Sequence, residues 1–262
     1  MVQRRYANGN SELLRSFADD LVRLRPDVIL CIGTEATLAA KGASTTIPIV
    51  MMMVGDPVGA GLVLSLSRPG ANVTGYSTAF PELEAKRASL LHELIPGLER
   101  VGVIFNPNNP LFRLNRANSD AAYHALRIEP IYVDVTSSAQ IENAIAQLAR
   151  RRAQALIVLA DPVLNTNAAT LVGAAQRYAL PTVAEGREMV EAGGLISYQP
   201  NLTDQIDRVT AMIDKVLRGS RPADIPVEQP TKFELIINLK TARTLGLAIP
   251  QSLLLRADEV IQ

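Results

Sequence analysis

The sequence contains a single cysteine, Cys31, in 262 residues, so it cannot form an internal disulfide. It lacks any group of residues with metal-ligand spacing, and we expect neither a metal nor a cofactor. An excess of charge of one sign is lacking too, because 26 basic residues balance 26 acidic ones and no run of Lys or Arg forms a basic stripe. Phosphate-backbone binding needs such a stripe, and we therefore expect no nucleic-acid partner.

Long apolar runs are also lacking. The longest ones, residues 48–54 and 58–66, are much shorter than the ~18 residues needed to cross a bilayer. Residues 1–6 are not followed by an apolar segment of signal-peptide length, so the sequence as given carries no export signal. These features predict a water-soluble chain.

The motifs of common enzyme classes are missing. There is no Gly-x-Ser-x-Gly nucleophile turn, no phosphate-binding Gly-x-x-x-x-Gly-Lys loop and no Gly-x-Gly-x-x-Gly dinucleotide motif. His92 and His124 fall within predicted helices, and Cys31 lies in a predicted strand, where a thiol behaves as a small buried hydrophobe. Because no nucleophile, base and orienting group form a set, we expect that the protein is not an enzyme.

Apolar patterns of helical and extended type alternate along the chain. Helical spacing covers residues 10–25, with Asn10 and Ser11 as capping candidates. A further helix is predicted to begin near Thr34, and others are predicted near 81–95, 111–126, 139–151, 165–178, 204–217 and 241–245. Strands are predicted at 28–32, 47–54, 101–105, 130–135, 155–160, 181–184, 194–198 and 233–239. This alternation predicts an α/β fold with predominantly parallel sheet.

The number of strands favours two lobes of similar size. We expect residues 1–98 to form the first lobe and residues 99–199 the second. Residues 200–228 are interpreted as a return helix and linker belonging to the first lobe, and residues 229–262 as a C-terminal segment of the second.

In open parallel sheets, ligands bind beyond the carboxyl ends of the strands. Gly33 and Thr34 lie at such an end and begin a helix, where amides and a hydroxyl favour an anion such as a carboxylate. The alternative is an ordinary helix cap by Thr34. Gly55 and Asp56 form the turn after the next strand, and Asp56 either contacts a ligand or holds its own turn.

Four more candidate residues follow later strands: Asn106, Asp161, Glu185 and Tyr198. Asp161 either caps the following helix or pairs with a ligand ammonium. Glu185 is either a binding residue or a solvated or capping carboxylate.

Several segments carry a resemblance to a known family and cover nearly the whole chain. They include Val28-Ile-Leu-Cys-Ile-Gly-Thr, Gly55-Asp-Pro-Val, Ser67-Arg-Pro-Gly-Ala-Asn-Val-Thr-Gly, Ala85-Lys-Arg, Asn106-Pro-Asn-Asn-Pro, Glu191-Ala-Gly-Gly-Leu-Ile-Ser-Tyr and Pro230-Thr-Lys-Phe-Glu-Leu-Ile-Ile-Asn-Leu-Lys-Thr-Ala. With these segments the chain resembles the ABC transporter substrate-binding family typified by tryptophan and tyrosine binders.

The resemblance implies a type I periplasmic binding protein fold: two doubly wound parallel-sheet lobes that close on a small ligand in the cleft between them and present it to a membrane permease. It also implies a periplasmic or cell-envelope location. The chain lacks the strand and helix with which such proteins normally begin, which predicts self-association through the incomplete first lobe.

For an amino-acid ligand, the resemblance places the carboxylate near Thr34 and the Gly55 amide, and the ammonium near Asp161 or Glu185. Tyr76, Phe80 and Tyr198 are candidates for contacts with its side chain, with plain packing as the alternative for each aromatic. A second function of the same fold, a ligand-sensing regulatory module, stays open at this point.

Overall fold

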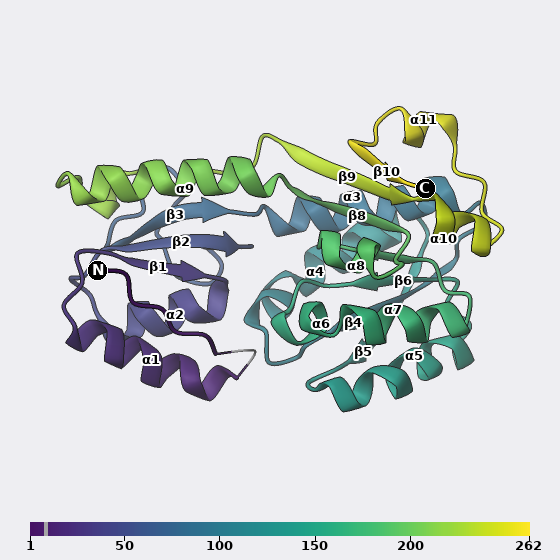
Figure 1. The fold of residues 1–262 in the computed structure, drawn as a ribbon, viewed down its shortest axis with the longest axis horizontal. Helices are drawn as coiled ribbons and strands as arrows, with labels where there is room; N and C mark the ends of the chain where they lie inside the picture. The colour runs from purple at the N-terminus through teal and green to yellow at the C-terminus, as the bar shows by residue number, and fades with distance from the viewer. Residues whose placement is uncertain (8–9) are drawn as a thin grey trace. The chain divides into compact units, whose positions relative to one another are not determined.

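The computed structural model describes residues 1–7 and 10–262 and divides into two compact units (Figure 1). Unit 1 comprises Met1–Phe80 and Pro200–Lys232, and unit 2 comprises Pro81–Gln199 and Phe233–Gln262. The first boundary therefore lies at Phe80 and not at residue 98. The helix that follows it belongs to unit 2 because its buried Glu84 and Arg87 contact other residues of that unit.

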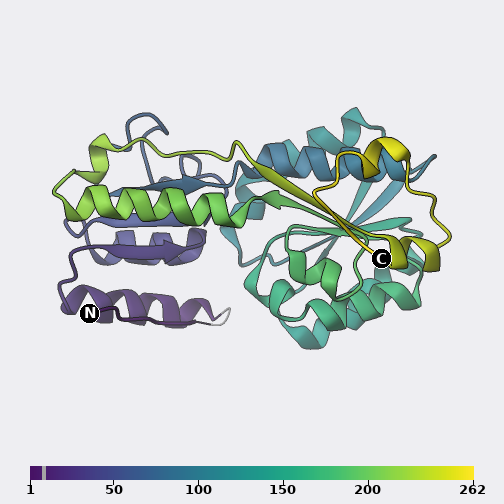
Figure 2. The ribbon, with the colours of Figure 1, turned by 45° about the horizontal axis from the view of Figure 1, so that its top comes forward.

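Unit 1 has a three-stranded parallel sheet in the order β1 (Ile29–Ile32), β2 (Ile49–Val54), β3 (Val73–Ser77). Figure 2 shows α1 (Ser11–Arg23) and α2 (Thr34–Ala43) on one side of this sheet and α9 (Leu202–Leu217) on the other. The predicted capping by Asn10 is confirmed, since its side chain accepts a hydrogen bond from the Glu12 amide at 3.0 Å.

Apolar residues of β2 alternate between two cores, as the strand period of two requires. Ile49 and Met51 pack with Cys31 toward α1 and α2, whereas Val50 and Met52 pack on the α9 side. Burial raises the pKa of the Cys31 thiol to about 12, so it behaves as the small buried hydrophobe that the sequence predicts.

Unit 2 has a seven-stranded sheet in the order β10-β9-β8-β7-β6-β4-β5. Its strands are β4 (Arg100–Phe105), β5 (Glu129–Asp134), β6 (Ala155–Val158), β7 (Thr182–Ala184), β8 (Ile196–Pro200), β9 (Phe233–Asn238) and β10 (Glu259–Ile261). The ladders from β5 to β8 are parallel. The strand β9 is antiparallel to β8. The Asn201 amide donates to the Lys232 carbonyl at one end of the pair, and the Asn238 amide donates to the Leu195 carbonyl at the other end.

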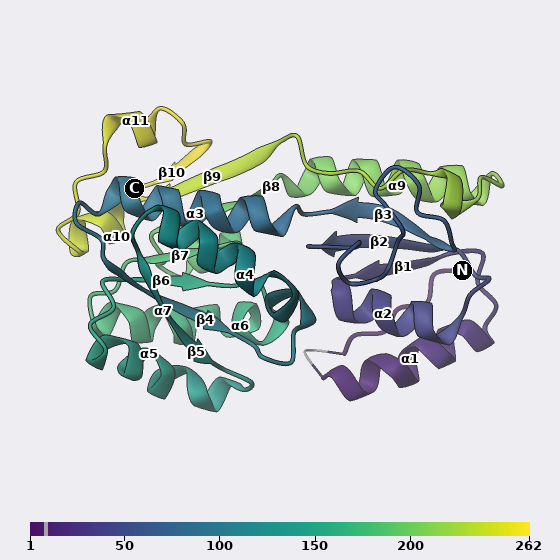
Figure 3. The same ribbon diagram turned by 180° about the vertical axis from the view of Figure 1, so that it is seen from behind.

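Helices cover both faces of this sheet. Figure 3 shows α3 (Phe80–Leu94) and α4 (Pro110–Ala125) on the near face, with α5 (Ile141–Arg150) and α7 (Ala168–Arg177) behind the strands. The shorter helices are η1 (Ser138–Gln140), α6 (Pro162–Thr166), α8 (Arg187–Glu191), α10 (Leu239–Thr244) and α11 (Gln251–Leu254), and η2 (Pro222–Asp224) lies in unit 1. The predicted α/β class is thus confirmed.

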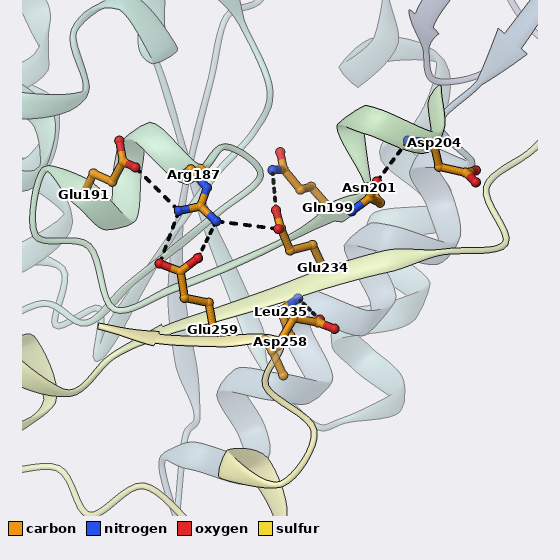
Figure 4. Close-up of polar contacts among 9 residues, drawn as sticks. All are labelled: Arg187, Glu191, Gln199, Asn201, Asp204, Glu234, Leu235, Asp258 and Glu259. Carbon is orange, nitrogen blue, oxygen red and sulfur yellow. Dashed lines mark hydrogen bonds and ion pairs between the residues drawn. The ribbon is translucent and has the colours of Figure 1, made fainter. Parts of the chain in front are cut away.

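No prediction from the sequence covers β3, α8, η2, α11 or β10. The helix expected over 165–178 is divided as well, because Asn167 lies between α6 and α7 with φ −107° and ψ 27°. The short edge strand β10 is tied to α8 by Arg187, whose guanidinium pairs with Glu259 and, at 3.6 Å each, with Glu191 and Glu234 (Figure 4).

Candidate ligand-binding residues

The loop after β1 begins with Gly33, whose φ of +90° lets the chain turn sharply from strand to helix. Gly33, not Thr34, is the N-cap of α2, so the interpretation of Thr34 as the cap is wrong. Thr34 is a buried first residue of the helix. The Gly33 amide is already used, because it donates to Met52 O at 2.8 Å. Any anion at this helix start would therefore rely on amides further along the first turn, including that of Thr34.

The loop after β2 is a turn held by Asp56. Its Oδ1 accepts the Gly59 amide at 2.8 Å, which is the local turn that the sequence analysis weighed against ligand contact. The carbonyl of the preceding Gly55 accepts the Phe80 amide and the Ser77 hydroxyl, each at 3.3 Å. Gly55 and Gly33 lie at the same edge of the unit 1 sheet, since β1 and β2 are paired in parallel.

In unit 2, Asn106 and Asp161 are in direct contact, with Asn106 Nδ2 donating to Asp161 Oδ1 at 3.2 Å. Asp161 also accepts from Asn109 Nδ2 at 3.2 Å and from the Val163 amide at 2.8 Å. The second of these bonds makes Asp161 the N-cap of α6, one of the two roles considered for it. Asp161 is 4% exposed, and its carboxylate accepts all three of these hydrogen bonds.

Glu185 and Tyr198 both contact a residue that was not among the candidate binding residues and appeared only within the segment Ala85-Lys-Arg. Arg87 of α3 pairs through Nη2 with Glu185 Oε2 at 3.1 Å, and its Nε and Nη2 donate to the Tyr198 carbonyl at 3.0 and 2.9 Å. Glu185 is therefore a largely buried carboxylate that is paired with a fully buried cation. The signal in the sequence was a charged pair, Glu84 and Arg87, within an otherwise apolar helix face.

Glu84 is a buried partner of this group. Its Oε1 accepts a short hydrogen bond from the Tyr123 hydroxyl, and its Oε2 lies 4.0 Å from Arg87 Nη1. Burial raises the pKa of Glu84, and Arg87 and the Tyr123 bond oppose that rise only in part. Burial also raises the pKa of Tyr123, so its hydroxyl is a proton donor at neutral pH.

The aromatic candidates differ in their surroundings. Tyr198 is half-buried and stacks on Phe233, with ring centroids 5.5 Å apart and planes at 12°. Tyr76 is fully buried in the core beneath α9, and Phe80 is only 1% exposed. Tyr76 and Phe80 are therefore packed against protein, and their contact with a ligand stays a prediction.

Over residues 1–7 and 10–262, no group of three or more His, Cys, Asp or Glu side chains could hold a metal ion. In the same part of the chain, none of the helices has the length and apolar character needed to cross a membrane.

Parallel α/β units with helices on both faces define the type I periplasmic binding protein fold, and solved structures of that fold match this chain. The family model described as ABC transporter substrate binding protein matches residues 1–261. The chain belongs to this family.

Relatives agree with this assignment. The Tyrosine-binding protein of Clostridioides difficile (strain R20291) is 27% identical over 241 residues, which are 92% of this chain and 69% of that protein. A conserved domain protein from Vibrio cholerae has a TM-score of 0.91 at 27% identity, covering 98% of this chain and 86% of that one. The ABC domain in complex with L-Trp from Streptococcus pneumoniae has a TM-score of 0.89 at 27% identity, covering 97% and 85%.

Proposed function

We propose that the chain is the solute-binding component of an ABC importer, which captures an amino acid, with aromatic ones foremost, and delivers it to a membrane permease. Membership of the substrate-binding family supports the general role. The ligand class rests on the tyrosine-binding relative and on the similar structure that contains L-Trp. We further propose that the protein works in the periplasm or cell envelope and has no catalytic activity.

The observation that carries this proposal is the set of polar groups at the carboxyl edges of the two sheets. In unit 1, we propose that the amides near Thr34 and Gly55 and the positive end of the α2 dipole receive the ligand carboxylate. In unit 2, we propose that the ligand ammonium is received by Glu185 in preference to Asp161. Asp161 already accepts three hydrogen bonds, whereas Glu185 pairs only with Arg87 among the residues that the structure describes.

Thermal unfolding with a panel of amino acids tests the proposal. A ligand that binds only the folded protein stabilises it by RT ln(1 + [L]/Kd), about 2.7 kcal/mol at a hundredfold excess over Kd. We expect L-Trp or L-Tyr to raise the melting temperature, and calorimetry to give the matching affinity. If no amino acid in the full set of twenty changes the melting temperature, the proposed function is wrong.

A second copy of the chain is the partner that we propose for the open edge of unit 1. The strand β1 is the last strand of its sheet, and its outward-facing Leu30 and Ile32 are 45% and 60% exposed. An edge strand presents unpaired amides and carbonyls, and a second copy offers the same edge in a self-complementary arrangement. We propose that the chain self-associates through β1.

A further inference from the structure

The buried guanidinium of Arg87 joins the ends of two neighbouring strands. The strand β7 ends at Ala184, which pairs with Ser197 of β8, so the Tyr198 carbonyl lies one residue beyond the ladder. Arg87 supplies two donors to that carbonyl, at 3.0 and 2.9 Å, in place of a strand amide. The same side chain holds Glu185, the residue that follows β7, at 3.1 Å.

This contact uses one oxygen of Glu185 and leaves the other unused. Arg87 pairs with Glu185 Oε2, and Oε1 has no hydrogen-bond partner among the residues that the structure describes. The Glu185 side chain is 11% exposed while that of Arg87 is 0% exposed. Arg87 is therefore covered by protein, and Glu185 is the member of the pair whose side chain keeps some exposure.

Charge also favours a cationic group at this place. Arg87 faces two carboxylates, Glu84 and Glu185, and Nη1 of Arg87 and Oε2 of Glu84 have no hydrogen-bond partner although both atoms are buried. Of the two carboxyl groups, Glu84 is fully buried and Glu185 keeps some exposure, so an incoming cation would meet Glu185 first.

We propose that Arg87 is a positioning residue that holds Glu185 so that its free oxygen recognises the ammonium group of the ligand. This inference rests on the proposed function and adds the residue that sets selectivity for an amino acid over the same molecule without its amino group. A lysine at position 87 is expected to hold Glu185 less well. In Arg87, Nε and Nη2 both donate to the Tyr198 carbonyl while Nη2 pairs with Glu185, and a lysine has no second nitrogen in a fixed plane to keep this orientation.

The test compares L-Trp with indole-3-propionate, which has the same ring and carboxylate but no ammonium. Calorimetric affinities for both are measured on the unmodified chain and on the Arg87→Lys, Arg87→Gln and Glu185→Gln variants. Arg177→Gln is the matched control, because Arg177 forms an exposed ion pair with Glu142 in the same unit. Circular dichroism establishes which variants fold, and Arg87→Lys retains a cation if Arg87→Gln does not fold.

We expect the ratio of the two affinities to fall roughly 10- to 100-fold in Arg87→Lys and in Glu185→Gln, the loss that follows removal of one charge-assisted hydrogen bond. Arg177→Gln keeps the ratio of the unmodified chain. A role of Arg87 in stability alone would lower the melting temperature and leave the ratio unchanged, and that result overturns the inference.

Amide hydrogen exchange gives a readout without ligand. Loss of the Arg87 contacts is expected to speed exchange in the segment 183–199 relative to Arg177→Gln, and unchanged exchange overturns the positioning role. If the unmodified chain binds no amino acid at all, the proposed function fails and the ammonium role fails with it. The exchange result then decides separately whether Arg87 positions Glu185.

Discussion

The side-chain amide of Asn106 donates a 3.2 Å hydrogen bond to Asp161, and both residues are buried. This bond links the loop after β4 to the cap of α6. Asn109 and the Val163 amide also donate to this carboxylate, so Asp161 accepts two hydrogen bonds from the loop after β4 and one from the first turn of α6. Its structural contribution can be measured apart from any contribution to binding.

Replacing Asp161 by alanine is expected to destabilise the protein by about 1–2 kcal/mol, the usual loss when a helix N-cap is removed. Asp161→Asn keeps an acceptor oxygen for the Val163 amide and is expected to lose less. Urea unfolding of both variants measures the difference. If Asp161→Asn folds normally but loses affinity for L-Trp, Asp161 contacts the ammonium in addition to its role as a cap; unchanged affinity assigns it to the cap alone.

The stability of the protein is expected to depend on pH through Glu84. Burial raises its pKa above the usual value of 4.5, so the folded state binds this proton more tightly than the unfolded chain does. The stabilisation from this group is therefore complete below about pH 4.5 and is lost as the pH rises toward the folded pKa. Glu84→Gln resembles the protonated acid and can still accept the Tyr123 hydrogen bond.

Urea unfolding of the unmodified chain and of Glu84→Gln is measured between pH 5 and pH 8. The difference at each pH isolates the contribution of Glu84 to the free energy of unfolding, because the two proteins share all other ionisable groups. We expect the unfolding free energy of Glu84→Gln to rise relative to that of the unmodified chain as the pH increases. A difference that stays constant over this range would contradict the prediction.

Gly75 in β3 is expected to tolerate no side chain. A Cβ at this position would lie 2.1 Å from Met51 O and 2.5 Å from Met51 N, and φ is +140°. Strain and overpacking of this kind cost roughly 1–3 kcal/mol each. Gly75→Ala should therefore unfold at much lower urea concentration, whereas Gly42→Ala in α2, with nothing within 4 Å, should be neutral or stabilising. Equal urea midpoints for Gly75→Ala and Gly42→Ala would contradict this prediction, because they would mean that β2 shifts to make room for the new side chain.

The sequence predicted the strands that form continuous apolar runs and missed those that do not. The strand β3 contains Thr74, Gly75 and Ser77, which are fully or almost fully buried without being apolar, because the backbone of β2 approaches Gly75 closely and Thr74 donates to Ile225 O. The strand β10 has only three residues and is held by the charges on Arg187 and Glu259, whose pairing no apolar pattern indicates.

The candidate binding residues were predicted only in part, because apolar patterns locate the ends of strands but not the contacts between distant residues. Strand ends can be located from the apolar runs, which placed Asn106, Asp161 and Glu185 at the edge of the unit 2 sheet. The contact between Arg87 and Glu185 joins residues 98 positions apart in the sequence, and periodicity within one helix gives no information about such a pair. A charged residue inside an apolar helix face indicates a buried partner without identifying it.

The self-association proposed for unit 1 predicts a mass above that of the monomer. Two copies that pair along β1 would cover Leu30 and Ile32, and the free energy gained grows with the apolar area removed from water. A lysine on an edge strand opposes such pairing because its charge must leave water. The double variant Leu30→Lys/Ile32→Lys is therefore expected to be monomeric.

Leu64→Lys is the matched control, since Leu64 is 78% exposed in the loop between β2 and β3 and contributes nothing to the β1 edge. Light scattering over a concentration series measures the mass of each protein, and a monomeric unmodified chain at every concentration would refute the self-association.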